Sequence, residues 1–340
     1  MQSFSYWPPL GLRSPIAHTI FTAYAQRLGC PYRWQPQREH LFEGAQGVPL
    51  YGQGCRVPHA RGTLIATYGI TGDLSNQWYL HTLAHWGQHR QFDVVLFDWR
   101  AHGRTGQLSP TLTSDGLYEG KDLQAIAHQC HDLGYTPPYW LVGYSLGGQL
   151  ALWGAWYAQQ AADHLIAGAA VICPNLDSNR SLAHLGRTFW GRRFERAISR
   201  ELQRLARQLH AAHPAHIDLA AVAGINTIAG FDQALVIERL GFPSVAAYYE
   251  ASSPLHFLPQ LQLPTWILYA ADDPLFDPAL VPELVAIASG NPALELVLSP
   301  YGGHVGFVSA RQCQHLWQDP DYCWGIHRLL DWVATHPLSS

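Results

Sequence analysis

Basic charge is scarce in this chain of 340 residues, and lysine is nearly absent. Lys121 is the only lysine, arginine supplies the remaining positive charge, and the formal net charge is −4. A nucleic-acid surface needs clustered basic residues, so nucleic acid is not an expected partner. Charged residues make up 14% of the chain and hydrophobic residues 48%, which excludes disorder and a coiled coil and predicts a large core.

Long apolar runs are also lacking. The longest, residues 165–173, is far shorter than the roughly 20 residues that a membrane-spanning helix needs. The first nine residues contain no basic segment followed by an apolar one, so the sequence predicts no secretory signal. We therefore expect a cytoplasmic protein.

Metal-ligand spacing is missing among the cysteines. In a chain of this size, scattered cysteines predict free and mostly buried thiols, and they indicate neither a disulfide framework nor a zinc site. The six cysteines are Cys30, Cys55, Cys130, Cys173, Cys313 and Cys323.

What the chain does have is an alternation of strand-like and helix-like segments, which predicts an α/β fold with a mostly parallel central sheet flanked by helices. Residues 1–60 instead suggest an irregular lead-in followed by a hairpin around 48–57. The predicted strands are 63–68, 92–97, 139–142, 165–173, 265–269 and 294–298. The predicted helices are 77–89, capped by Ser75 or Asn76, then 118–133, 146–159, 280–288 and 322–335.

The alternation stops between about residues 174 and 263, where the pattern is helical without a convincing strand. It resumes with the strand at 265–269. We therefore predict one domain spanning residues 1–340, with a helical cap at 175–262 inserted between two strands of the core.

The most informative motif is Gly-Tyr-Ser-Leu-Gly-Gly at residues 143–148. It lies between a predicted buried strand and a predicted helix. A Gly-x-Ser-x-Gly in that context is the nucleophile elbow of α/β-hydrolases, in which a tight turn presents the serine hydroxyl to a cleft. Ser145 is therefore the predicted nucleophile.

A serine hydroxyl needs a base within hydrogen-bond reach and a carboxylate that orients the base. In α/β-hydrolases the order along the chain is serine, acid, histidine. Asp272 and Asp273 follow one predicted strand and His304 follows the next, at the sheet edge where such folds place their ligands. We predict His304 as the general base and Asp273 as the acid, with Asp272 as the alternative.

An oxyanion hole needs two backbone amides that point at the developing negative charge. The residue after the nucleophile, Leu146, supplies one at the start of a helix. The loop that begins Tyr68-Gly69 is expected to supply the other, from Ile70.

Three polar residues, Asp98, Arg100 and His102, also follow a predicted strand. They precede the serine and duplicate roles already filled, so we interpret them as a network that stabilises a turn.

These motifs together resemble the YheT-like branch of the α/β-hydrolase superfamily, whose members include hydrolases of lipid esters. The resemblance spans residues 8 to 336, and it places the family's catalytic serine, aspartate and histidine on Ser145, Asp273 and His304. One departure is the family's usual His-Gly at the oxyanion loop, where this chain has Tyr68-Gly69. The segments that carry the resemblance are 12–20, 143–148, 247–255 running into Pro264-Thr265, and 302–307.

Residues 193–209 form an amphipathic helix candidate within the predicted cap. Apolar residues recur at intervals of three and four, and five arginines form a second stripe. The helix is interpreted either as lying on an anionic membrane surface or as packing its apolar face on the core, with its arginines in solvent or paired with Glu195 and Glu201.

The sequence therefore predicts a serine hydrolase of carboxylic esters with an apolar acyl group, acting through an acyl-serine intermediate and needing no metal or organic cofactor. An acyltransferase or a cofactor-free perhydrolase would use the same three side chains. A non-catalytic lipid-binding module is the remaining alternative.

Overall fold

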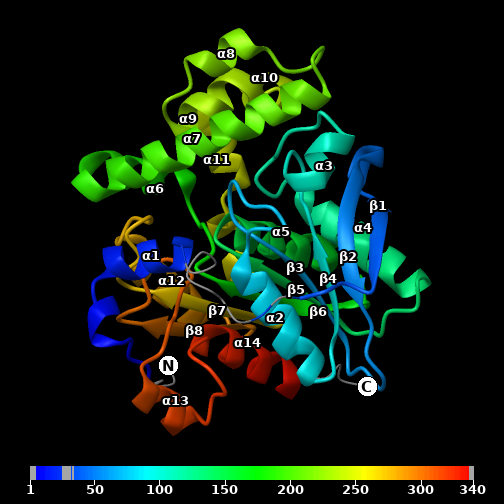
Figure 1. Cartoon of the computed structure of the whole chain (residues 1–340), viewed down its shortest axis with the longest axis vertical. Coiled ribbons are helices and arrows are strands. Elements are labelled where there is room, and N and C mark those ends of the chain that lie inside the picture. Colours follow the sequence, from blue (N-terminus) through cyan, green and yellow to red (C-terminus); the bar gives the residue numbers. More distant parts are fainter. Residues whose placement is uncertain (1–4, 25–31, 33, 337–340) are drawn as a thin grey trace.

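The computed structural model describes residues 5–24, 32 and 34–336. Within them, eight strands form one sheet in the order β1-β2-β4-β3-β5-β6-β7-β8 (Figure 1). Strand β2 is antiparallel to both of its neighbours, β1 and β4, and the six strands β3 to β8 pair in parallel. The strands are β1 (Arg38–Glu43), β2 (Pro49–Cys55), β3 (Thr63–Thr67), β4 (Asp93–Phe97), β5 (Tyr139–Tyr144), β6 (Ile166–Ile172), β7 (Thr265–Ala270) and β8 (Leu294–Ser299).

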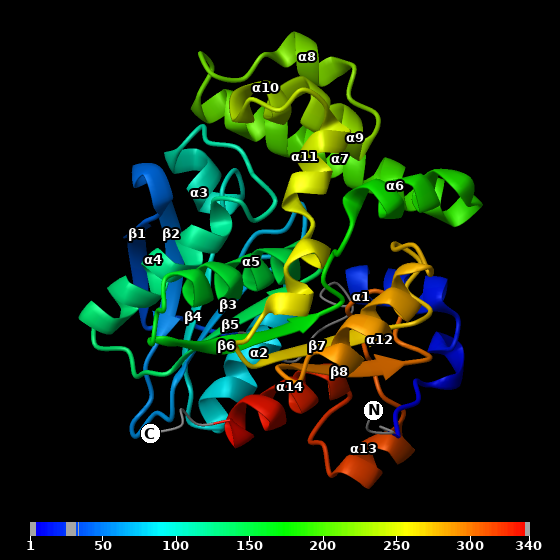
Figure 2. The same ribbon diagram turned by 180° about the vertical axis from the view of Figure 1, so that it is seen from behind.

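Helices cover both faces of this sheet, so the predicted α/β fold is confirmed. One face carries α2 (Trp78–His89) and α14 (Trp324–Thr335) (Figure 1). The opposite face carries α4 (Glu119–Asp132), α5 (Leu146–Gln160) and α12 (Leu280–Gly290) (Figure 2). All five correspond to helices predicted from the sequence, with bounds that differ by at most two residues.

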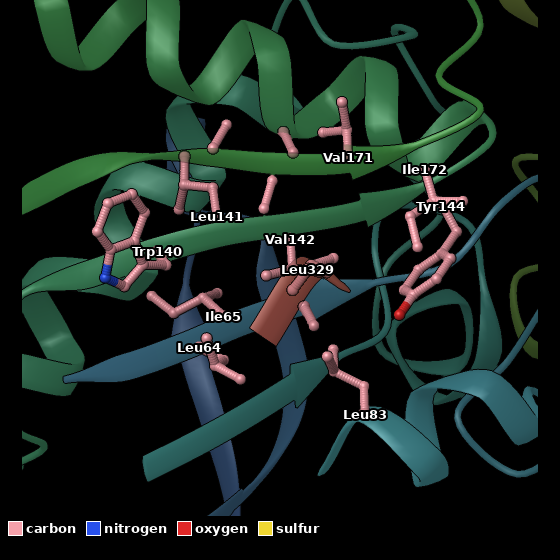
Figure 3. Packing of buried hydrophobic residues seen from close by; sticks show 14 of the residues in the cluster. Leu64, Ile65, Leu83, Trp140, Leu141, Val142, Tyr144, Val171, Ile172 and Leu329 are labelled. Atoms are coloured by element: carbon pink, nitrogen blue, oxygen red, sulfur yellow. The ribbon is translucent and has the colours of Figure 1, made fainter. Parts of the chain in front are cut away.

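The central strands are buried on both faces. Every residue of β3, β4, β5, β6 and β7 is buried, which is why these strands appear in the sequence as unbroken apolar runs and not as alternating ones. Figure 3 shows side chains of three of these strands meeting those of the covering helices. The labelled side chains are Leu64, Ile65, Leu83, Trp140, Leu141, Val142, Tyr144, Val171, Ile172 and Leu329.

The prediction for the first 60 residues was wrong in two respects. The lead-in contains the helix α1 (Pro15–Tyr24). The hairpin pairs Arg38–Glu43 with Pro49–Cys55, so residues 48–57 contain only its second strand. Its turn precedes Val48, because Gly44 N–H donates to the Val48 carbonyl at 2.7 Å and Gly47 adopts a left-handed φ of 71°.

The predicted capping of α2 was also wrong. The N-cap is Gln77, which makes no side-chain capping hydrogen bond. Ser75 and Asn76 instead bind Asp73, whose carboxylate accepts from Ser75 N–H at 2.7 Å and from the Asn76 amide at 2.7 Å.

Two further helices, α3 (Gly103–Leu108) and α13 (Arg311–Trp317), were not predicted, because neither is long enough to show a helical period in the sequence.

Between β6 and β7 the chain leaves the sheet and forms a layer of helices over the end of the molecule where the parallel strands finish (Figures 1 and 2). A second hydrophobic cluster holds these helices together, with Leu202, Leu205 and Leu209 of α7 at its centre. The helices are α6 (Ser178–Arg187), α7 (Phe189–Ala212), α8 (Leu219–Ala223), α9 (Ile228–Phe231), α10 (Ile237–Leu240) and α11 (Val245–Ser252). No helix in the described part of the chain is both long and apolar enough to cross a membrane.

One buried ion pair ties the segment after β4 to helix α4. Arg100 donates through Nε to Asp122 at 2.7 Å and through a terminal nitrogen at 2.9 Å, and both side chains are 1% exposed. Ala45 closes the arrangement, because its N–H donates to Asp122 and its carbonyl accepts from Arg100. A carboxylate buried this deeply depends on its cation for compensation.

Arg100→Met should therefore lower the free energy of unfolding by about 3–5 kcal/mol, because it leaves Asp122 without its cation. Arg204→Gln is the matched control: it breaks an exposed pair with Glu201 and should cost about 0–1 kcal/mol. Urea denaturation of the two variants measures the difference. Equal losses in both would contradict the structural role of the buried pair.

Candidate active site

The turn between β5 and α5 holds Ser145 in a strained conformation. Ser145 has φ 57° and ψ −124°, a region that residues with a side chain seldom adopt. Glycines make the turn possible: a Cβ on Gly143 would lie 2.0 Å from the Gly147 carbonyl oxygen, and one on Gly147 would lie 2.4 Å from the Tyr68 carbonyl oxygen. The motif therefore forms a tight elbow at the end of a buried strand.

Three side chains from three loops meet at this elbow. His304 Nε2 lies 2.8 Å from Ser145 Oγ, and His304 Nδ1 lies 2.8 Å from Asp273 Oδ2. Ser145 follows β5, Asp273 follows β7 and His304 follows β8, so residues up to 159 positions apart form one continuous row of hydrogen bonds. This order of hydroxyl, imidazole and carboxylate is the geometry that activates a serine.

The two adjacent aspartates have different partners. Asp273 is buried, and it binds the imidazole and accepts the Leu275 N–H at 2.9 Å. Asp272 instead accepts the Gly303 N–H at 3.0 Å, and burial raises the pKa of its carboxyl to about 6. Asp272 thus supports the loop that carries the histidine, and Asp273 faces the ring.

The histidine loop has two supports that the sequence did not indicate. Thr19 Oγ1, on α1, accepts the His304 N–H at 3.0 Å. The ring of Phe276 meets the imidazole edge-on, with 5.2 Å between ring centroids. Neither contact follows a local pattern, although Thr19 lies within the segment 12–20 on which the family resemblance partly depended.

Both residues predicted for the oxyanion hole lie at the elbow. Leu146 is the first residue of α5, so its N–H has no acceptor within the helix. The loop that contains Ile70 approaches from β3: a Cβ on Gly69 would lie 2.9 Å from Ser145 Cβ and 3.2 Å from its Oγ. Ile70 and Leu146 both line the cavity beside Ser145.

Tyr68 and two polar residues after β4 hold that loop in place. The Tyr68 hydroxyl donates to Asp98 at 2.5 Å, and Asp98 also accepts the Leu74 N–H at 3.1 Å. His102 Nδ1 is 2.9 Å from the Arg100 carbonyl, so it carries the proton and leaves Nε2 free to accept the Thr71 N–H at 3.2 Å. Burial lowers the pKa of His102 to about 4, which keeps the ring neutral. Tyr68 thus supports the loop at the position where the family usually has histidine.

A buried cysteine also lies beside this row of residues. Cys173, Asp273 and His304 bring a thiol, a carboxylate and an imidazole within 4.8 Å of one another. Burial raises the pKa of Cys173 well above its ordinary value, so the thiol stays protonated and is a poor metal ligand. The other described cysteines, Cys55, Cys130, Cys313 and Cys323, are likewise buried and unbridged; Cys30 lies outside the described residues.

A cavity opens from Ser145 beneath the helices of residues 175–262. Its wall is mainly apolar, with contributions from α6, α7 and α9 above and from the loop after β7 below. Polar groups at a few positions interrupt this wall. The apolar lining residues are Ile70, Trp99, Ala101, Leu146, Leu182, Leu185, Ile198, Leu202, Leu205, Ile228, Phe231, Leu275 and Phe276.

Known proteins are similar to this chain in sequence. Residues 62–310 match the family model of the alpha/beta hydrolase fold. A protein of Synechocystis sp. named "Putative esterase slr0264" is 47% identical, with 98% of this chain and 95% of that protein covered. "Putative esterase YheT" of Escherichia coli is 26% identical, with 80% and 76% covered. The chain therefore belongs to the α/β-hydrolase superfamily. Within the superfamily it lies in the YheT-like branch.

Solved structures agree on the fold. The esterase Pf2001 of Pyrococcus furiosus matches with a TM-score of 0.56 at 17% identity, covering 88% of this chain and 95% of that one. An identity this low shows a shared architecture only.

The hydrogen bond between His304 and Asp273 should be visible by proton NMR. We expect a far-downfield Nδ1 proton resonance at low temperature, because a hydrogen bond to a carboxylate polarises the N–H bond and deshields its proton. Asp273→Asn should remove the resonance or shift it strongly upfield, whereas Asp272→Asn should retain it. The opposite result would assign the contact to Asp272.

Proposed function

We propose that this protein, a carboxylic ester hydrolase by its family and relatives, uses Ser145, His304 and Asp273 as a catalytic triad. Ser145 Oγ attacks the ester carbonyl while His304 Nε2 accepts its proton. The imidazolium then returns that proton to the leaving alkoxide, which gives an acyl-serine and a free alcohol. A water molecule activated by the same imidazole releases the acid.

The observation that carries this proposal is the row of hydrogen bonds from Ser145 through His304 to Asp273, at 2.8 Å each. Asp273 holds the protonated Nδ1 and so directs the lone pair of Nε2 at the serine. The amides of Ile70 and Leu146 are proposed to bind the oxyanion of the tetrahedral intermediate.

The segment 175–262 is proposed to act as a cap inserted into a single hydrolase domain that spans residues 1–340. Its helices α6, α7 and α9 supply much of the apolar wall beside Ser145. A wall of this kind favours esters with an apolar acyl chain, because binding such a chain removes apolar surface from water.

Ser145→Ala should lower kcat for p-nitrophenyl esters by about a million-fold, and Asp273→Asn by about ten-thousand-fold, with KM changed little. A fluorophosphonate probe should label the wild-type protein and leave Ser145→Ala unlabelled. Asp272→Asn is the control and should retain most of the activity, because an amide oxygen at this position can still accept the Gly303 N–H. Equal labelling of wild type and Ser145→Ala would place the nucleophile elsewhere.

Hydrolysis and acyl transfer would both proceed through the acyl-serine intermediate, and the products of the reaction distinguish them. We expect free acid as the main product when short alcohols or peroxide compete with water. Esters or peracids as the main product would assign the protein to an acyltransferase or perhydrolase activity.

Peripheral contact with an anionic lipid surface is proposed for the start of α7. The apolar residues Leu202, Leu205 and Leu209 of this helix are buried in the molecule, so they are not free to meet a membrane. At its first turn, however, Phe189 is 58% exposed and Trp190 is 46% exposed. Exposed arginines of the same helix lie next to them in the sequence, and this combination suits a negatively charged interface.

Phe189→Ser together with Trp190→Ser should therefore weaken binding to vesicles of anionic phospholipid by about tenfold, because it removes two aromatic anchors. Vesicle sedimentation measures the effect. Leu219→Ser removes an exposed apolar side chain elsewhere on the same helical layer and serves as the control. Unchanged binding of the double variant, or no binding of the wild type, would exclude this contact.

A further inference from the structure

Two carboxylates interrupt the apolar wall of the cavity. Asp115 comes from the loop between α3 and α4, and Asp232 comes from the helical layer above it. Both residues are buried, with 6% of their surface exposed. Since these positions are far apart in the sequence, folding alone brings them to the same cavity.

These two carboxylates lack the compensation that the other buried acids have. Every other buried aspartate or glutamate in the described part of the chain accepts at least one backbone N–H, namely Asp93, Asp98, Glu119, Asp122 and Asp273. Asp115 and Asp232 accept none there, and neither forms an ion pair with a described residue. Their partners are hydroxyl groups: Asp115 accepts from Thr113 Oγ1 at 3.2 Å and interacts with the Tyr248 hydroxyl, and Asp232 accepts from the Tyr249 hydroxyl.

The backbone at both positions is unusual. Asp115 has a left-handed φ of 48°, and the Gln149 side chain binds its carbonyl at 2.7 Å. Asp232 begins a π-helical turn, Asp232–Val236, a distortion that is frequent at functional sites. Burial raises the pKa of Asp115 to about 7, and that of Asp232 well above its ordinary value. The fold therefore bears a cost to keep both acids at this cavity.

A second, independent feature of the same cavity indicates a ligand. Ser181, on α6, lines it and is 3% exposed, yet its hydroxyl has no hydrogen-bond partner among the described residues. Trp99 also lines this cavity and is 1% exposed, and its indole N–H likewise has no hydrogen-bond partner among the described residues. A buried polar group left unpaired costs free energy, and a bound polar group would remove that cost.

We propose that Asp115, Asp232 and Ser181 form a polar subsite that binds a hydrogen-bond-donating group of the ester, a hydroxyl or an ammonium, carried on an apolar spacer. The carboxylates accept its hydrogens, and Ser181 supplies one further hydrogen bond. The apolar wall between this subsite and Ser145 holds the spacer. The inference rests on the proposed function, and it adds a polar requirement to the preference for apolar chains.

The test is a matched series of esters whose spacers run from two to eight carbons. One arm varies the alcohol portion, as alkyl, ω-hydroxyalkyl, ω-aminoalkyl and ω-carboxyalkyl esters of one acid. The other varies the acyl portion, as ethyl esters of alkanoic and ω-hydroxyalkanoic acids. At the best spacer length, kcat/KM should favour the hydroxyl or ammonium ester over its alkyl counterpart by at least about tenfold, and it should be lowest for the carboxylate. The arm that shows the preference identifies the portion that reaches the subsite.

Asp232→Asn and Asp115→Asn should each reduce the preference for the ammonium ester by about tenfold or more, measured as a ratio of kcat/KM values within each variant. Because both esters are measured on the same preparation of each variant, a lower yield of folded protein does not change this ratio. Glu238→Gln removes an exposed carboxylate from the same helical layer and should leave the ratio unchanged.

An alkyl ester hydrolysed as well as its hydroxyl and ammonium counterparts would overturn the subsite and leave the proposed function intact. Retention of the wild-type ratio by both asparagine variants would overturn the subsite in the same way. Failure to hydrolyse any ester of the series, alkyl esters included, would overturn the proposed function and the subsite with it.

Discussion

The arrangement of the site depends on how closely three backbones meet at Ser145. The strand β5, the helix α5 and the loop after β3 converge there, and glycine is the only residue that fits at the contacts. The left-handed conformation of Ser145 costs about 1–3 kcal/mol. The complete burial of β5 and of most of α5 offsets that cost, because neither element can shift without losing its packing.

The sheet fixes the positions of the other two side chains of the proposed triad, Asp273 and His304. In a parallel sheet all strands end at one edge, so the loops after β5, β7 and β8 open on the same side of the molecule. The remaining precision comes from contacts outside the sheet. Thr19 holds the backbone of His304 and Asp272 holds Gly303, so the imidazole is fixed by segments from both halves of the chain.

The parts of the structure with a local pattern could be predicted from the sequence, and those set by distant contacts could not. Apolar runs revealed the central strands, and the spacing of glycines around Ser145 revealed the elbow. The choice between Asp272 and Asp273 depended on the direction of two adjacent side chains in one loop, which no periodicity encodes. Helix α1 was not predicted. Its contact with the loop that carries His304 joins segments far apart in the sequence, and no local pattern indicates such a contact. Asp115 and Asp232 gave no signal, because two isolated aspartates are ordinary in any sequence.

Buried charge in this molecule follows a consistent rule, and its exceptions are informative. Where a carboxylate only supports the fold, neighbouring groups neutralise or solvate it: Asp122 has Arg100, and Asp98 has a hydroxyl and backbone amides. Desolvating an acid that has neither a cation nor a backbone N–H beside it is costly. The structure bears that cost at Asp115 and Asp232, both of which line the cavity that begins at Ser145. A fold that could have buried apolar residues at these positions instead presents acceptors there, and a substrate that supplies the missing hydrogens accounts for both.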